Sequence, residues 1–217
     1  MENERKNQEV GNVEKGIDKE EQEQGEELTS IHMEVHVKIP EDRVGVLIGK
    51  NGSVKKYIQD ETGTVIEIST DEGSGGVTIR LTPECQDPTM VWIARDIVKA
   101  IGRGFNEDKA CKLLDENYRF EIINIGDMGS PKRVKQIKGR LIGQHGKTRS
   151  TIEETTNVFM SVYGKTVSLI GEMGDVDIAK KAIEMILEGR QLGTVFKFLE
   201  RNQTRRKKSA RILWETS

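Results

Sequence analysis

The sequence lacks several features that would point to common protein classes. Cys85 and Cys111 are its two cysteines, and without a CxxC spacing they favour reduced thiols over a disulfide framework or a thiolate metal site. No apolar run approaches the roughly 20 residues that a membrane span needs. The first ten residues are polar and do not resemble a signal peptide. We therefore expect a cytoplasmic protein with no membrane partner.

Negative charge is concentrated at the amino end. Residues 1–30 hold ten Asp or Glu against four Lys or Arg, and no aromatic residue. Such a segment buries too little apolar surface to offset the entropy lost on ordering, so we expect a disordered acidic tail. Residues 31–217 hold 30 Lys or Arg against 26 Asp or Glu. This modest positive surplus allows a polyanionic partner without requiring one.

An internal repeat is the most informative feature of the chain. The segment VGVLIGKNG at 44–52 reappears as KGRLIGQHG at 138–146, an offset of 94 residues. The register continues past the glycines and aligns Ile58 with Ile152. A period this long predicts two duplicated domains rather than a solenoid.

The hydrophobic pattern around each loop predicts the same order of elements. In the first copy it predicts a strand at 33–39, a short helix before the loop, a helix at 53–61, a strand at 65–68, a glycine-rich turn at 72–76, a strand at 77–81 and a helix at 90–101. In the second copy it predicts a strand at 118–124, helices at 132–142 and 147–155, strands near 157–162 and 166–170, and a helix over 178–187. Ser130 followed by Pro131 is a typical helix start.

The pattern also gives domain boundaries. We expect a tail at 1–30, a first unit at 31–104, a connecting segment at 105–117, a second unit at 118–190 and a carboxyl-terminal helix with a basic tail at 191–217. The connecting segment lacks the composition of a flexible linker, so the units should pack together. Apolar residues at 192–199 predict the last helix. The basic run that follows, with Arg201, Arg205, Arg206, Lys207, Lys208 and Arg211, would extend a phosphate track.

This order of elements, with LIGKNG at 47–52 and LIGQHG at 141–146, resembles the type I KH fold. The resemblance implies an α+β fold of two tandem KH domains, each with a three-stranded antiparallel sheet packed on three helices. KH proteins use the GxxG loop to clamp the backbone of a short single strand. The chain therefore resembles an RNA-binding protein.

The residue types suit that chemistry. Glycines let the main chain approach phosphates closely, and the following helix offers free N–H groups and the positive end of its dipole. Ile48 and Ile142 would form the floor beneath unstacked bases. The predicted RNA-binding residues are Ile48, Gly49, Lys50, Asn51, Gly52, Ser53, Lys55 and Lys56 in the first copy, and Lys138, Arg140, Ile142, Gly143, Gln144, His145, Gly146, Lys147, Thr148 and Arg149 in the second.

One position departs from the common KH pattern, which has an aliphatic residue three places after the second glycine. Lys55 and Arg149 stand there. Either Val54 and Thr148 take over the packing, or the helix is rotated slightly.

Other site types fit the sequence less well. Gly146-Lys-Thr imitates the end of a Walker A motif, but Leu141 stands where its first glycine is needed. His32 and His36 belong to an alternating strand, which favours solvent-facing residues over zinc ligands. No catalytic constellation recurs near either loop. We expect no enzyme activity, no metal and no cofactor.

The second copy carries a closer resemblance. The stretch at 133–156 and the later LGTVFKFLE at 192–200 resemble the partner-of-Nob family of ribosome-biogenesis proteins, whose archaeal members are grouped with Krr-type KH proteins. The resemblance implies binding of small-subunit ribosomal RNA near its 3′ end, close to where the Nob endonuclease cuts. It also implies association with the alpha subunit of translation initiation factor two. Eukaryotic members have a degraded first loop, so the intact loop at 49–52 favours an archaeal protein.

Two questions stay open at this point. A general single-strand binder of messenger RNA or of a decay complex, and a protein-docking scaffold with vestigial loops, share most of these features. The first unit is compatible with RNA or with protein. The second unit is predicted to be the principal RNA clamp because its flank is denser in cations, with Lys132, Arg133, Lys135, Lys138, Arg140, Lys147 and Arg149.

Overall fold

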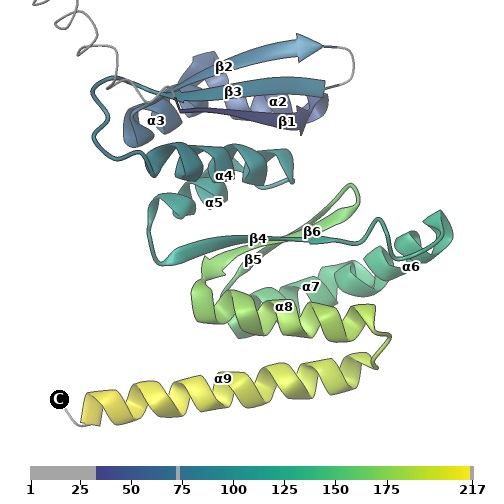
Figure 1. Ribbon diagram of the computed structural model, residues 1–217. Coiled ribbons are helices and arrows are strands. Elements are labelled where there is room, and N and C mark those ends of the chain that lie inside the picture. The colour runs from purple at the N-terminus through teal and green to yellow at the C-terminus, as the bar shows by residue number, and fades with distance from the viewer. Residues whose placement is uncertain (1–32, 72–73, 216–217) are drawn as a thin grey trace, which may run out of the picture. The chain divides into compact units, whose positions relative to one another are not determined.

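The computed structural model describes residues 33–71 and 74–215 (Figure 1). The acidic tail predicted at 1–30 lies outside the described residues, as do His32 and residues 72–73 of the predicted turn. Residues from Glu34 onward form one compact unit that contains both copies of the repeat.

The first copy has the predicted order of elements. They are β1 (Glu34–Pro40), α2 (Glu41–Ile48), the short helix η1 (Lys50–Gly52), α3 (Ser53–Thr62), β2 (Thr64–Asp71), β3 (Ser74–Leu81) and α4 (Met90–Gly102). The strands pair antiparallel in the order β1-β3-β2. Helices α2, α3 and α4 contact the sheet and one another. This is a three-stranded antiparallel sheet packed on three helices.

The second copy repeats this arrangement after a short helical connection. The connection contains α5 (Glu107–Ala110) and η2 (Cys111–Leu114). The copy itself contains β4 (Tyr118–Asn124), α6 (Pro131–Ile142), η3 (Gln144–Gly146), α7 (Lys147–Thr156), β5 (Phe159–Tyr163), β6 (Thr166–Glu172) and α8 (Met173–Leu187), followed by α9 (Leu192–Glu215). Its sheet order is β4-β6-β5, again antiparallel. The predicted α+β fold of two tandem domains is confirmed.

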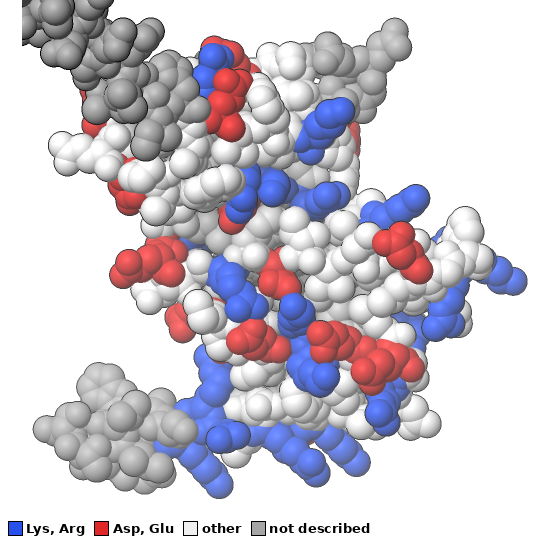
Figure 2. All heavy atoms as spheres, viewed as in Figure 1, with Lys and Arg blue, Asp and Glu red and all other residues white. Residues whose placement is uncertain are grey.

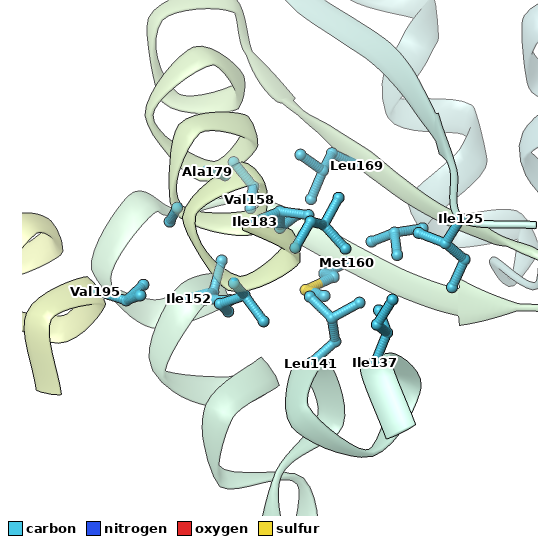
Figure 3. Packing of buried hydrophobic residues seen from close by; sticks show 14 of the residues in the cluster. Ile125, Ile137, Leu141, Ile152, Val158, Met160, Leu169, Ala179, Ile183 and Val195 are labelled. Carbon is cyan, nitrogen blue, oxygen red and sulfur yellow. The ribbon is translucent and has the colours of Figure 1, made fainter. Parts of the chain in front are cut away.

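The same offset of 94 residues that aligns the loops also aligns the cores. Leu47 and Ile58 are fully buried in the first domain, and their counterparts Leu141 and Ile152 are fully buried in the second. Figure 3 shows Leu141 and Ile152 directed toward the centre of the second core, with Val195 of α9 reaching toward Ile152 from outside. Each loop is therefore held between two helices that are fixed by buried aliphatic side chains.

The glycine-rich turn is shorter than predicted. Residues 74–76 belong to β3 and pair with β2 instead of forming a turn. Gly75 lies under α2, where an added Cβ would stand 2.4 Å from Cγ2 of Val44. Glycine is thus required here for the close approach of a helix to the sheet, a role that sequence composition does not distinguish from a turn.

The strand predicted from residue 157 begins later, at Phe159. Asn157 ends α7 in the left-handed conformation, with φ of 55°. Its counterpart Gly63 ends α3 with φ of 57°. Asparagine tolerates this conformation better than most side chains, so it replaces glycine at the same helix end.

The last helix is longer than predicted, because α9 continues through the basic run instead of ending before it. Val195 and Leu199 are buried against the second domain. Further along, Arg206 pairs with Asp175 of α8 at 2.6 Å. Burial raises the pKa of the Asp175 carboxyl, and the Arg206 guanidinium opposes that shift. Lys and Arg are good helix formers, so the basic run extends the helix once its first turns are anchored.

Side-chain contacts join the two domains, as the composition of the connecting segment indicates. The ring of Phe105 meets that of Phe120 edge to face, with centroids 6.4 Å apart. The Ser161 hydroxyl donates to the carbonyl of Arg103 at 2.8 Å. The Tyr163 hydroxyl donates to the Asp42 carboxylate at 2.7 Å, which raises the pKa of Tyr163.

Candidate nucleic-acid interface

Each glycine loop makes the same sharp turn between two helices. In the first domain, Gly49 ends α2 with φ of 72° and ψ of 179°, and its N–H donates to the carbonyl of Gly45 at 3.0 Å. Asn51 and Gly52 then take left-handed conformations, with φ of 54° and 79°. The N–H of Gly52 donates back to the Gly49 carbonyl at 3.3 Å before α3 begins.

The second loop repeats these angles within a few degrees. Gly143 has φ of 74° and ψ of 175°, His145 has φ of 52°, and Gly146 has φ of 78°. The backbone conformation of Gly49 and Gly143 is essentially restricted to glycine. The two loops are therefore one structural device used twice, although their middle residues differ.

Lys55 and Arg149 stand where the common KH pattern has an aliphatic residue, and the residues before them, Val54 and Thr148, take over the packing. Val54 and Thr148 are buried, with 9% and 3% of their surface exposed. A Cβ on Gly49 would lie 2.3 Å from Cγ2 of Val54, and one on Gly143 would lie 2.3 Å from Oγ1 of Thr148. The position directly before Lys55 and Arg149 thus does the packing, and it is the reason why the first glycine of each loop has no room for a side chain.

The helices after the loops begin without a side-chain cap. The capping positions before α3 and α7 are Gly52 and Gly146, which have no side chain that could accept a hydrogen bond from the first turn. The first N–H group of each helix is used by the short helix before it, since Ser53 donates to the carbonyl of Lys50 and Lys147 to that of Gln144. The remaining N–H groups of the first turn have no intrahelical partner. Together with the helix dipole, they form a favourable position for a phosphate.

The predicted contact residues around the loops are largely accessible. Ile48 and Ile142 each expose 38%, which is high for a large aliphatic side chain and suits stacking or contact with a base. The side chains of Lys50, Asn51, Ser53, Lys56, Gln144, His145 and Lys147 are exposed, whereas those of Lys55, Lys138 and Arg149 are half-buried. Within residues 33–71 and 74–215, the tips of both loops are thus open to a ligand.

Arg140 has a different role from the other predicted contacts. Its guanidinium donates to the carbonyl of Ile186 at 3.0 Å and also to the carbonyl of Arg190, at the end of α8. In the first domain, Arg43 donates to the carbonyls of Ile101 and Phe105 at the end of α4. The carbonyls of Ile101 and Ile186 also accept from the N–H groups of Gly104 and Gly189, so each arginine adds a second donor at a helix end. It also ties that end to the carbonyl of a residue beyond the helix. The sequence repeat does not reveal this, because the two arginines are not aligned by the offset of 94.

A second pair of residues, missed by sequence reasoning, links each helix to the neighbouring edge strand. The Gln59 side-chain oxygen accepts from the N–H of Ile66 at 2.9 Å. Its counterpart Glu153 accepts from the N–H of Met160 at 2.8 Å and also pairs with Arg149 at 3.2 Å. The offset of 94 would have found this pair. The ion pair also partly neutralises Arg149, one of the predicted phosphate contacts.

The surroundings of the two loops differ in charge. A hollow of about 690 Å³ beside α3 is lined by Ser53, Val54, Tyr57, Glu107, Asp108, Cys111 and Lys112. Burial, aided by the nearby carboxylates, raises the pKa of the Cys111 thiol to about 11. A hollow of about 350 Å³ along α6 has Lys135, Lys138 and Lys165 in its lining and no carboxylate. The second loop therefore has the more cationic flank.

Among residues 33–71 and 74–215, no group of His, Cys, Asp or Glu side chains has the arrangement of a metal site. His36 is exposed and lies beside the hydroxyl of Thr78 at 3.1 Å. The helices in this part of the chain are all too short or too polar to cross a membrane.

Comparisons with known proteins agree with this geometry. Residues 34–98 match the family model described as KH domain, and residues 119–204 match a second one described as eukaryotic type KH-domain, KH-domain type I. The chain is 49% identical, over 180 residues, to a KH domain-containing protein of Methanocaldococcus jannaschii, covering 82% of this chain and 78% of the relative.

Solved structures give the same result. Dim2p from Pyrococcus horikoshii is 48% identical with a TM-score of 0.70, and the match covers 78% of this chain and 99% of that one. A complex of a/eIF2alpha, aDim2p and rRNA from the same organism contains a chain that is 45% identical with a TM-score of 0.73, covering 81% and 97%. A protein of unknown function from Aeropyrum pernix is 36% identical with a TM-score of 0.77, covering 87% and 100%.

The fold and the two loops define a tandem KH-domain protein that binds RNA. Within that class, the chain belongs to the ribosome-biogenesis family that includes the archaeal Dim2 proteins, the family called partner of Nob above.

Proposed function

We propose that this protein binds the 3′ region of small-subunit ribosomal RNA as a single strand during ribosome maturation. The observation that carries the proposal is the pair of accessible GxxG loops with matching backbone angles. A relative of 45% identity has been crystallised in a complex with rRNA and a/eIF2alpha. That relative supports ribosomal RNA over messenger RNA as the ligand, and supports the alpha subunit of the initiation factor as a protein partner.

Within this proposal, the second domain is the stronger RNA clamp. Residues 118–190 hold 12 Lys or Arg against 9 Asp or Glu, whereas residues 31–104 hold 9 against 11. Glu107 and Asp108 add negative charge beside α3, and no such pair lines the hollow along α6. Phosphates should therefore approach the second loop at a lower electrostatic cost. The Nob endonuclease is a further expected partner, on the family resemblance alone.

A matched pair of loop variants tests both parts of the proposal. Gln144→Asp with His145→Asp places two carboxylates on the second loop. Asn51→Asp with Ser53→Asp places two carboxylates on the first loop and changes its formal charge by the same amount. All four side chains are exposed, so the fold should tolerate the changes. We expect the second-loop variant to bind a short small-subunit 3′-end RNA at least tenfold more weakly, about 1.4 kcal/mol or more, and the first-loop variant to lose less.

A scrambled RNA of equal length is the control ligand. Equal affinity of the wild-type protein for both RNAs would support a general single-strand binder and overturn the ribosomal assignment. If neither loop variant lost affinity, the loops would be vestigial and the protein a docking scaffold. A larger loss from the first loop than from the second would reverse the proposed ranking of the domains.

A further inference from the structure

Most of the net positive charge of residues 31–217 lies after the two KH domains. Residues 31–191 hold 23 Lys or Arg against 24 Asp or Glu, because the surplus of the second domain is offset by the first domain and the connection. Residues 192–217 hold 7 Lys or Arg against 2 Asp or Glu. The helix α9, which covers most of this last segment, therefore supplies the net positive charge.

The cations of α9 are arranged on its outer side. Lys197, Arg201 and Lys208 follow one another at intervals of four and seven residues, which places them on one face of a helix. All three side chains are exposed. Figure 2 shows blue side chains gathered along the edge of the molecule that Figure 1 assigns to α9. The row rises about 16 Å along the helix axis.

This face is held in place by the opposite face of the same helix. Val195 and Leu199 are buried against the second domain, with 0% and 1% exposed. Arg206 points the other way, to the buried carboxylate of Asp175, and is excluded from the row because its charge is compensated. The acidic neighbours are Glu200, on α9 itself, and Glu154, across a hollow that Lys207 also lines. Neither one outweighs the row.

We propose that the outer face of α9 is a second RNA-binding surface that contacts the phosphate backbone without reading sequence. The row offers charged groups on long side chains, with no aromatic ring for stacking among the residues of the row. This composition fits phosphates and not bases. The surface does not depend on the GxxG loops, so it accepts duplex RNA, which a single-strand clamp does not.

The experiment uses a blunt RNA duplex of about 16 base pairs, the length that a double-strand-binding domain spans. Lys197→Gln, Arg201→Gln and Lys208→Gln remove three exposed cations together. A control that removes the same charge, Lys38→Gln, Lys181→Gln and Arg190→Gln, takes three exposed cations from β1, α8 and the turn after α8. The full chain is used throughout, and thermal unfolding checks that each variant is folded.

We expect wild-type protein and the control to bind the duplex with affinity that falls steeply with salt. The α9 variant should bind about tenfold or more weakly, and its slope of log K against log salt should be shallower by about 2 to 3. The second-loop variant should keep duplex binding while losing the single-stranded RNA. Failure of α9 and failure of the loops are thereby distinguished.

Three results would overturn the inference. If the wild-type protein did not bind the duplex, α9 would not be an RNA-binding surface of the proposed kind. Equal losses in the α9 variant and the control would show an effect of net charge alone. Unchanged RNA binding in the α9 variant would instead indicate that this face meets an acidic protein.

Discussion

The first and second KH domains carry glycine loops of the same conformation in different electrostatic surroundings. Gly49 and Gly143 differ by 2° in φ and 4° in ψ, and each is held over a buried residue at the start of the next helix. The second domain, however, has the cationic hollow and the additional helix α9. Loop geometry was kept after the duplication because packing determines it, whereas the surface charge around the loops was free to change.

The comparison shows which features an aligned repeat does and does not preserve. Around the loops, the buried and positive-φ positions are kept at an offset of 94 residues, from Leu47 and Leu141 to Gly63 and Asn157. The strands before the loops, β1 and β4, do not follow this offset. In each domain an arginine donates to carbonyls at the end of α4 or α8. Arg43 and Arg140 share this role but stand on different turns of α2 and α6, so they do not align. A guanidinium on a long side chain reaches the same carbonyls from more than one position.

The largest expected loss of stability comes from variants that test whether packing fixes the backbone conformation of the two loops. Gly49→Ala and Gly143→Ala each place a Cβ within 2.9 Å of three atoms of the next helix, at a backbone conformation that only glycine adopts easily. Each should lower the free energy of unfolding by about 2 to 4 kcal/mol. Denaturant titration measures the loss.

Gly52→Ala and Gly146→Ala are the matched controls. An added Cβ meets nothing within 4 Å at either residue, and the left-handed conformation alone costs about 1 kcal/mol. If all four variants lost the same stability, the close contacts with Val54 and Thr148 would not be the reason for the first glycine.

The next effect separates a structural arginine from an RNA contact. Arg43→Met and Arg140→Met remove the arginine donor from the carbonyls of Phe105 and Arg190, and one of two donors from those of Ile101 and Ile186. Each should cost about 1 to 3 kcal/mol of stability. The Arg140 variant should keep the wild-type salt dependence of RNA binding. A shallower slope with unchanged stability would mean that Arg140 binds phosphate after all, as the sequence alone suggested.

The smallest expected effect concerns the residue beneath each loop. Val54→Thr buries a hydroxyl in the first domain and should cost about 1 to 2 kcal/mol. The reverse change, Thr148→Val, keeps the volume and should change stability by less than about 1 kcal/mol in either direction. Both are read from urea midpoints. A loss from Thr148→Val larger than that from Val54→Thr would show that the two loops are packed by different interactions.

Much of the fold and part of the site are readable from the repeat. The order of elements, the helix start at Ser130 and the left-handed glycines follow from local rules that act over a few residues. The errors have specific causes. Gly75 looked like a turn residue because composition does not report the approach of Val44 from another helix. The basic run looked like a tail because its anchor, Asp175, is distant in sequence.

The sequence by itself determined the two domains, the conformation of both loops and the position of the cations along the chain. These depend on hydrophobic periodicity and on backbone conformations that few residue types allow. Only the tertiary structure decided which cations face solvent. The donors of Arg140 and the charge of Arg206 are taken up by carbonyls and a carboxylate of α8 and the turn after it, while Lys197, Arg201 and Lys208 remain exposed. Partners far apart in sequence make that difference, and long-range packing brings them together.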